Sequence, residues 1–213
     1  MTLRLLPAFG TADLRSALVE TDPELLDRLR AGDEQAFSLI VHRYQEPMVR
    51  FARSLCPSQA IAEEAVQDTW MAVVRGIDRF EGRSTFKTWL FHVLANRARS
   101  AGLGEQRHVP RETGRAVDLS HFNAQGAWAQ PNETWLDESV DRLDAAQWVK
   151  PLRAALDDLP PRQRQVLLLR DVEGLSSAEV CNILQISPGN LRLLLHRGRN
   201  GLREALQPMM GRN

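Results

Sequence analysis

The sequence predicts an all-α fold of two small helical domains joined by a flexible linker, the C-terminal one a helix-turn-helix. Residues 22–100 and 138–213 carry apolar side chains at intervals of three and four, the spacing of one helix face. Between them, residues 101–137 lose this spacing and gather Gly, Pro, Asn, Gln and Ser, as linkers do. A loop of that length is unusual inside a compact domain. Residues 1–21 form an N-terminal extension to which we assign no role.

Helix-start signals divide the N-terminal stretch into several helices. Asp22 precedes Pro23, which places a capping side chain before a proline suited to the first helical position. Asp33 precedes the next apolar run in the same way. The segment Cys56-Pro57-Ser58 then ends one helix before another begins near Ala60 and runs to Arg75. A helical bundle follows from this order.

The C-terminal stretch contains a helix-turn-helix pattern. Pro160-Pro161 begins one helix, and Ser176 and Glu179 then have the spacing of a capping box at the start of a short helix over 177–184. A turn over 185–187 follows, and Ser187 is positioned to cap a longer basic helix whose first residue is Pro188. A short helix, a three-residue turn and a longer helix are the elements of that motif.

The longer helix has an apolar face and a basic face. Leu191, Leu195, Gly198 and Leu202 are expected to pack inward, which leaves four arginines outside: Arg192, Arg197, Arg199 and Arg203. A capped helix N-terminus with flanking arginines suits the major groove of DNA. The alternative is a solvated arginine face on an ordinary helix.

Charge is uneven although the chain is neutral overall, with 27 basic and 27 acidic residues. Residues 79–99 hold five basic residues and one acid, and residues 187–203 hold four arginines and no acid. The region 101–150 is acidic, with 5 basic against 8 acidic residues. Local basic patches bind phosphate even in a neutral chain, so nucleic acid is an expected partner.

Other functional classes find little support in the sequence. The two cysteines lie far apart and the five histidines are scattered, so we expect no metal site, no cofactor and no catalytic centre. No apolar run approaches the about 20 residues of a membrane span. The apolar stretch at the start of the chain is too short for a signal peptide. We therefore expect a cytoplasmic protein without direct membrane insertion.

Two segments carry a resemblance to a known family. The C-terminal one reads LPPRQRQVLLLRDVEGLSSAEVCNILQISPGNLRLLLHRGRNGLREAL. The N-terminal one reads AEEAVQDTWMAVVRGIDRFEGRSTFKTWLFHVLANRARS. Together they resemble regions 4 and 2 of the extracytoplasmic-function sigma factors of bacterial RNA polymerase. The resemblance implies core-polymerase and minus-ten binding by 22–100 and minus-thirty-five binding by 138–213.

The resemblance also assigns site residues. Those expected to bind core polymerase are Glu64, Gln67, Asp68 and Trp70, of which the first three share one helix surface. Those expected at the minus-ten element are Arg79, Arg83, Ser84, Phe86, Lys87, Trp89, Asn96 and Arg97. Those expected at the minus-thirty-five element are Ser187, Pro188, Asn190, Arg192, Leu194, Arg197 and Arg199. Phe86 and Trp89 lie three apart, so either of them could hold an unstacked base or belong to the core.

Two positions depart from the family pattern. Ser100 stands where relatives usually have an Asp, which affects part of the minus-ten surface. In the basic helix, Leu193 and Leu194 replace a small polar and a basic residue. An exposed Leu-Leu pair could meet thymine methyl groups, pack on a partner protein or close over neighbouring helices.

The implied partners are core RNA polymerase, promoter DNA and an anti-sigma factor, which in relatives is often in the inner membrane. The free chain is expected to be a monomer and not an enzyme, because polymerase supplies the catalysis. The alternative function is a polymerase-independent regulator, in which 22–100 senses a signal and the helix-turn-helix binds an operator as a dimer. An adaptor that binds only polymerase is a third interpretation.

Trp128 and Trp135 either anchor the linker on a protein surface or cover one of the domains.

Overall fold

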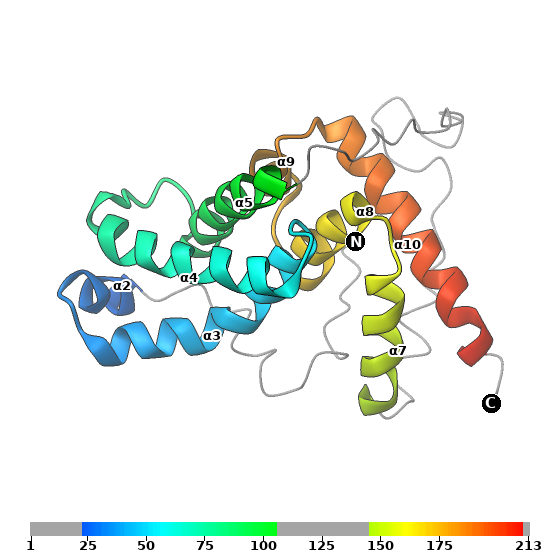
Figure 1. The fold of residues 1–213 in the computed structure, drawn as a ribbon, viewed down its shortest axis with the longest axis horizontal. Helices are drawn as coiled ribbons and strands as arrows, with labels where there is room; N and C mark the ends of the chain where they lie inside the picture. The colour runs from blue at the N-terminus through cyan, green and yellow to red at the C-terminus, as the bar shows by residue number, and fades with distance from the viewer. Residues whose placement is uncertain (1–22, 106–144, 211–213) are drawn as a thin grey trace.

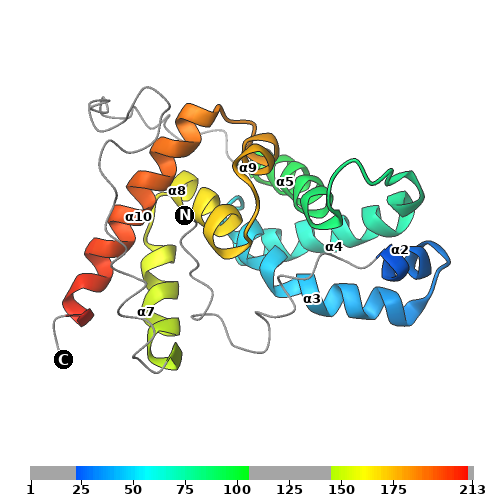
Figure 2. The same ribbon diagram turned by 180° about the vertical axis from the view of Figure 1, so that it is seen from behind.

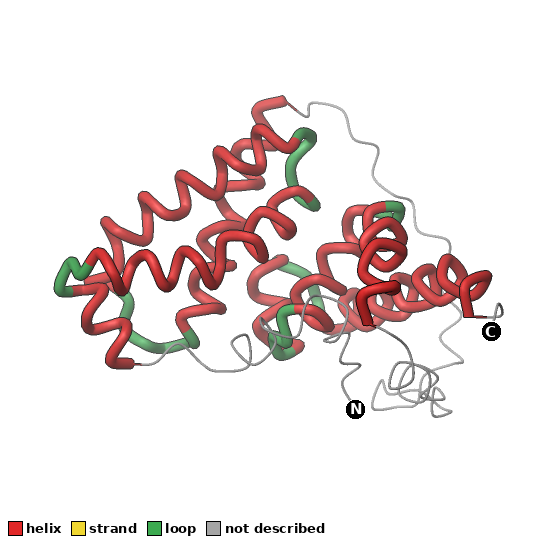
Figure 3. Tube along the Cα trace, turned by 90° about the horizontal axis from the view of Figure 1, so that it is seen from below, coloured by secondary structure: helices red, strands yellow, loops and turns green. Residues whose placement is uncertain are grey.

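The computed structural model describes residues 23–105 and 145–210, and in these ranges every regular element is a helix (Figures 1 and 3). This agrees with the all-α fold expected from the sequence. The expectations for residues 1–21, for Trp128 and for Trp135 fall outside the described residues.

The N-terminal half is a bundle in which α4 packs against α3 on one side and α5 on the other. Its elements are α2 (Pro23–Arg30), α3 (Glu34–Arg53), α4 (Gln59–Gly76), the 3-10 turn η2 (Ile77–Arg79) and α5 (Phe86–Glu105). Ile40, Phe51, Val66, Leu90 and Phe91 are fully or almost fully buried between these helices. Burying each such side chain contributes about 1.5 to 3 kcal/mol.

Local caps fix where these helices begin. The Asp33 side chain accepts hydrogen bonds from the backbone N–H groups of Gln35 at 2.8 Å and Ala36 at 3.2 Å. Its second oxygen accepts from Arg28 Nε at 2.8 Å, and this bond is the main reason that the pKa of Asp33 lies below its ordinary value. Ser58 caps α4 through the N–H of Ile61. The helix start predicted after Asp33 is confirmed, and α4 begins at Gln59, next to the expected start near Ala60.

The C-terminal half is a second helical unit that α10 crosses. Its elements are α7 (Ala145–Asp157), α8 (Pro161–Leu167), the π-helical turn η4 (Leu168–Val172), α9 (Ser177–Leu184) and α10 (Pro188–Met210). Helix α10 packs on α7, α8 and α9, and Figure 2 shows it running along the outer edge of the molecule. The helices cross closely at Gly198, where an added Cβ atom would lie 2.8 Å from Leu167 Cδ1.

The helix-turn-helix forms as the sequence predicted. Ser176 and Glu179 make both hydrogen bonds of the capping box at the start of α9. Gln185 ends α9 with a left-handed backbone, φ 55°, which turns the chain toward α10. Ser187 Oγ then accepts from the N–H of Asn190 at 3.2 Å and caps the second helix.

The linker begins later than the sequence suggested, because α5 continues to Glu105 instead of ending at Ser100. Gly102 is buried in this extension, and a Cβ atom placed on it would lie 3.2 Å from the carbonyl oxygen of Leu55. A glycine that discourages helix in isolation is favoured here by close packing on the α3–α4 connection. Helix α5 therefore extends five residues beyond the expected end of the N-terminal domain at residue 100.

The two halves pack against one another. Helix α5 lies beside α9 in both views of the ribbon (Figures 1 and 2). The buried Gln165 Nε2 donates a hydrogen bond of 2.7 Å to the carbonyl oxygen of Ser54 in the other half. One continuous apolar cluster includes side chains from both halves. We call this α5–α9 contact, with the polar bonds across it, the seam.

The close crossing at Gly198 gives a first prediction. Gly198→Ala is expected to lower the free energy of unfolding by about 1 to 3 kcal/mol, because the new methyl group would overlap Leu167. Urea unfolding measures this. The matched control is Gly189→Ala on the same helix, where an added Cβ atom meets nothing within 4 Å. The stability of this control should be unchanged or raised by up to about 1 kcal/mol. Equal losses in both variants would contradict the packing argument.

The lowered pKa of Asp33 gives a second prediction. A carboxylate whose pKa is depressed by folding adds stability that is complete above its unfolded pKa of about 3.9 and is lost as the pH falls below that value and through the lower folded-state pKa. Asp33→Asn keeps a capping oxygen but loses the charge that faces Arg28. It should therefore be less stable than the wild type at pH 7, and the difference in the free energy of unfolding should shrink as the pH falls below about 4. A gap that stays constant with pH in chemical unfolding would contradict the electrostatic account.

Candidate nucleic-acid and protein interfaces

Glu64, Gln67 and Asp68 lie together on the outer face of α4. All three are exposed, while Ala65, Val66 and Thr69 of the same helix are buried on its other face. The buried Thr69 hydroxyl donates to the carbonyl oxygen of Ala65 at 2.7 Å, so it needs no partner outside the helix. The structure therefore brings the three predicted polar residues together on one accessible surface.

Trp70 is not part of that surface. Its side chain is 8% exposed, its Nε1 donates to Gln45 Oε1 at 2.7 Å, and Phe37 packs edge-on against its ring at 5.9 Å. Trp70 was expected to contact polymerase, and in this structure its ring fills the space between α3 and α4. It supports the surface from below.

Two apolar residues extend the surface in a way that the sequence analysis missed. Met71 is 51% exposed and Val74 is 56% exposed. They follow Gln67 at four and seven residues, so they continue the same helical stripe. That spacing was visible in the sequence, but only their exposure separates them from core residues. We call Glu64, Gln67, Asp68, Met71 and Val74 the α4 face.

The loop before α5 places several predicted minus-ten residues in solvent. Arg79, Arg83 and Ser84 are exposed, and Gly82 turns the chain with φ +70°. Arg83 makes an ion pair of 3.0 Å with Glu81, in which both side chains are mostly exposed. A pair this exposed contributes little to stability, so the Arg83 guanidinium remains available to a phosphate.

The aromatic residues at the start of α5 form a cluster. Phe86 is 3% exposed and lies about 6 Å from the rings of Tyr44, Phe80 and Trp89. Of the two alternatives for Phe86, the structure places its ring in the core. Trp89 is half-buried and packs on Phe80 at 5.2 Å. Of the two aromatic candidates, only Trp89 has ring surface left for a base.

Lys87 points across the seam. Its Nζ lies 2.9 Å from Glu173 Oε2 and donates to the Glu173 carbonyl oxygen at 2.6 Å. The side chains of Lys87 and Glu173 are 14% and 8% exposed, so the pair is largely shielded from water. A predicted minus-ten contact is therefore neutralised by the other half of the chain.

Neighbouring residues of α5 add further bonds across the seam. The Thr88 hydroxyl donates to Glu179, the same carboxylate that closes the capping box of α9. Burial works to raise the pKa of Glu179, but the hydrogen bonds from Ser176 and Thr88 outweigh it and hold that pKa below its ordinary value. Arg99 donates to the carbonyl oxygen of Ile183 near the end of α9.

The last two predicted minus-ten residues lie further along α5. Asn96 is exposed and accepts from Arg99 Nη1 at 2.9 Å. Arg97 is half-buried and lies 4.0 Å from Asp68 on the α4 face. This ion pair joins a residue expected to contact DNA to one expected to contact polymerase.

The first turn of α10 presents its polar residues outward. Ser187, Pro188, Asn190 and Arg192 are all exposed. They surround the helix N-terminus, where free N–H groups favour an approaching phosphate. The structure therefore places these four predicted residues of the turn in solvent.

Two predicted residues of α10 serve the fold. Leu194 is 8% exposed and lies in the core, so of the three alternatives for the Leu-Leu pair it closes over neighbouring helices.

Arg199 makes a two-pronged ion pair with Asp171, at 2.9 Å and 2.6 Å. The side chain of Asp171 is fully buried, so Arg199 is needed to neutralise it. In this structure, Leu194 and Arg199, both expected to contact DNA, contribute to the core and to this ion pair. Arg197, the remaining residue, is half-buried.

Asp171 was missed because it lies in the apolar run LLLRDV, where nothing in the local sequence shows which base will neutralise it. Among the residues that the structure describes, no group of His, Cys, Asp and Glu side chains is arranged to hold a metal ion. The described helices include none that is long and apolar enough to span a membrane.

Two family models match the chain. Sigma-70 region 2 matches residues 40–107, which include α4, the exposed loop and α5. Sigma-70 region 4 matches residues 150–202, which include the helix-turn-helix. Together the two matches cover more than half of the chain, in the order that the sequence predicted.

Curated relatives and a solved structure agree with these matches. The chain is 28% identical over 195 residues to the ECF RNA polymerase sigma-E factor of Escherichia coli K12, covering 90% of this chain and 97% of that protein. It is 29% identical to the RNA polymerase sigma-H factor of Pseudomonas aeruginosa PAO1, covering 90% and 96%. CnrH, solved in complex with the cytosolic domain of CnrY, has a similar fold, with a TM-score of 0.51, 22% identity and coverage of 87% and 96%. With both regions matched and relatives aligned along almost their whole length, the chain belongs to the extracytoplasmic-function sigma factors, which direct transcription initiation.

Proposed function

We propose that this sigma factor binds core RNA polymerase through the α4 face and promoter DNA through two separate surfaces. The minus-ten element is bound by the loop that carries Arg79, Arg83 and Ser84 and by Lys87, Trp89, Asn96 and Arg97. The minus-thirty-five element is bound by the first turn of α10. The proposal rests on one observation. The same chain carries the exposed α4 face and a capped helix-turn-helix whose second helix begins with an exposed turn.

The chemistry of the α10 turn supports duplex reading. Asn190 and Arg192 are exposed beside the capped N-terminus, and Asn and Arg side chains form two-pronged hydrogen bonds with adenine and guanine in the major groove. The N-terminal backbone of α10 attracts phosphate through its free N–H groups. In this proposal the chain positions polymerase on the promoter and leaves the reaction itself to polymerase.

The geometry of the seam supports an opening step. Two promoter elements about 17 base pairs apart are separated by roughly 55 to 60 Å along duplex DNA. Helices α5 and α9 are in direct contact, so the described arrangement cannot engage both elements at once. Lys87 and Arg99 also face the other half instead of solvent. We therefore propose that this closed form is the resting state and that the two halves separate on polymerase.

A protein partner that grips both halves would keep the chain closed. CnrH was solved with the cytosolic domain of CnrY bound, and we propose an anti-sigma factor for this chain. The proposed compartment is the cytoplasm, where polymerase and DNA lie, and the proposed free form is a monomer. The alternative of a polymerase-independent regulator is not favoured, because its sensing domain would occupy the segment that matches region 2.

Removing the polar part of the α4 face tests the polymerase contact. The double variant Glu64→Ala with Gln67→Ala should weaken binding to core polymerase at least about tenfold, which is about 1.4 kcal/mol. Run-off transcription from the gene's own upstream region should fall with it. The matched control is Glu204→Ala with Gln207→Ala, which removes the same pair at the same spacing from an exposed part of α10. If both double variants bind and transcribe alike, the α4 face is not the docking surface.

Breaking the Lys87–Glu173 pair from either side tests the closed form. Glu173→Ala removes the carboxylate that neutralises Lys87, so the free protein should bind the non-template strand of the minus-ten region several-fold more tightly than the wild type does. Lys87→Ala breaks the same pair but removes the cation, so its binding should not increase. Fluorescence anisotropy with a labelled oligonucleotide measures both, and circular dichroism checks that both variants fold. Equal affinities for all three proteins would exclude a seam that masks Lys87.

A further inference from the structure

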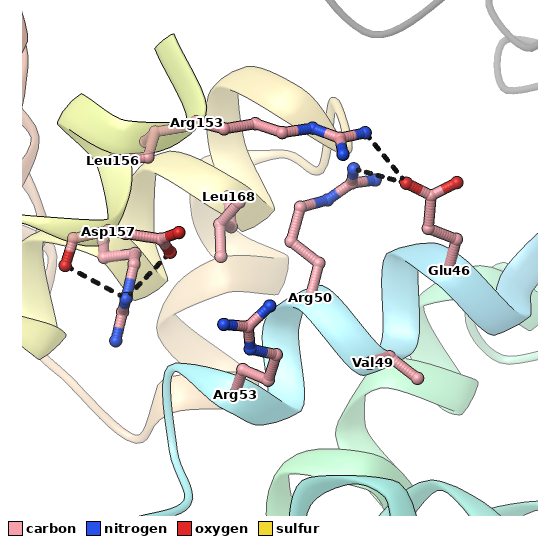
Figure 4. Close-up of a pocket in the computed structure, with 9 residues that line it drawn as sticks. Glu46, Val49, Arg50, Arg53, Arg153, Leu156, Asp157 and Leu168 are labelled. Atoms are coloured by element: carbon pink, nitrogen blue, oxygen red, sulfur yellow. Dashed lines mark hydrogen bonds and ion pairs between the residues drawn. The ribbon is translucent and has the colours of Figure 1, made fainter. Parts of the chain in front are cut away.

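A cleft lined by arginines lies where the two halves meet on the side of α3 (Figure 4). One wall comes from α3 of the N-terminal half, and the other comes from α7, α8 and the start of η4 in the C-terminal half. The cleft has a volume of about 140 Å³, and Leu156 and Leu168 contribute apolar surface to it. The four basic side chains that line it are Arg50, Arg53, Arg153 and Arg164.

Acidic side chains compensate only part of this charge. Glu46 lies 3.1 Å from Arg153 and 3.6 Å from Arg50. Asp157 lies 3.1 Å from Arg164. Arg50 also lies 3.7 Å from Glu173, a carboxylate that it shares with Lys87. The four arginines and Lys87 therefore face three carboxylates, which leaves a surplus of two positive charges.

Among the four arginines of the lining, Arg53 is the one whose side chain has no ion-pair or hydrogen-bond partner among the described residues. It is exposed, and no ion pair or hydrogen bond joins its side chain to any residue in the described ranges 23–105 and 145–210. Figure 4 shows its guanidinium group directed into the space between Arg50 and Asp157. The Nε of Arg164, on the opposite wall, is buried without a hydrogen-bond acceptor among the described residues. The α3 wall thus offers an unpaired guanidinium group, and the opposite wall holds a buried guanidinium N–H without an acceptor.

We propose that this cleft binds a phosphoryl dianion, supplied as inorganic phosphate or as the phosphate group of a small organic molecule. The planar guanidinium fork matches the spacing of phosphate oxygens and forms paired, charge-assisted hydrogen bonds. A dianion balances the surplus of two charges, whereas a single carboxylate balances only one of them. Arg53 from α3 is the principal ligand, and Arg164 contributes from α8.

The position of the cleft makes such a ligand specific for the closed form. Because its walls come from different halves, separating the halves divides the site. A ligand that binds only one of two forms shifts the population toward that form. Bound phosphate would therefore oppose opening and restrain promoter binding. This regulatory part rests on the proposed function, whereas binding of the anion does not.

Calorimetry on the full chain tests the site. Sodium phosphate and adenosine 5′-monophosphate are titrated at constant ionic strength set with sodium chloride. Arg53→Ala should weaken binding at least about tenfold, because it removes a ligand that supports no other described side chain. The matched control is Arg43→Ala, which removes the same residue type from the same helix outside the cleft. Its affinity should equal that of the wild type.

The outcomes distinguish phosphate binding in the cleft from its proposed effect on opening. No binding above the chloride baseline, or equal binding by wild type and Arg53→Ala, overturns the site. Selective binding supports it, and the stronger of the two ligands identifies the phosphate source. Run-off transcription in phosphate-free buffer tests the sigma function alone, since Arg53→Ala should be as active there as the wild type. Added ligand should then inhibit the wild type more than Arg53→Ala. Equal inhibition of both proteins overturns the coupling to closure.

Discussion

The ion pair between Lys87 and Glu173 is the interaction on which the closed arrangement depends. Both side chains are largely shielded from water, so Lys87 would be costly to bury without Glu173, whose carboxylate also lies 3.7 Å from Arg50. Such a pair adds little net stability, since the attraction mainly offsets desolvation. Its effect is on specificity, because only one register of α5 against η4 and α9 satisfies both charges. When the halves separate, water solvates both groups again, and the two forms can therefore lie close in free energy.

The sequence revealed those parts of the fold that short-range interactions determine. Asp33, Ser176 and Ser187 each cap the helix that they were expected to cap, because a cap depends on residues two or three positions away. The end of α5 was placed too early because Gly102 packs on a carbonyl group 47 positions away in sequence. The seam was not foreseen for the same reason. Its bonds join residues more than 80 positions apart.

The candidate surfaces divide in a similar way. Charged and polar candidates such as Glu64, Asp68 and Arg192 are exposed, since water solvates them wherever the fold allows. Apolar candidates were ambiguous, because a helix stripe that binds a partner has the same spacing as one that faces the core. Trp70 and Leu194 are buried, while Met71 lies in solvent. Only the positions of neighbouring helices distinguish these cases, and those positions depend on contacts across the whole chain.

Glu179 illustrates how the seam restricts which residues selection can accept. In an isolated capping box, Glu and Gln are interchangeable, since one oxygen is enough for the backbone N–H. Here one oxygen of Glu179 accepts from the Ser176 N–H and the other accepts from Thr88. A glutamine would turn an NH₂ group toward one of these donors. Homologues that keep the closed form should therefore retain Glu at this position. Homologues that have lost the closed form can carry Gln there instead.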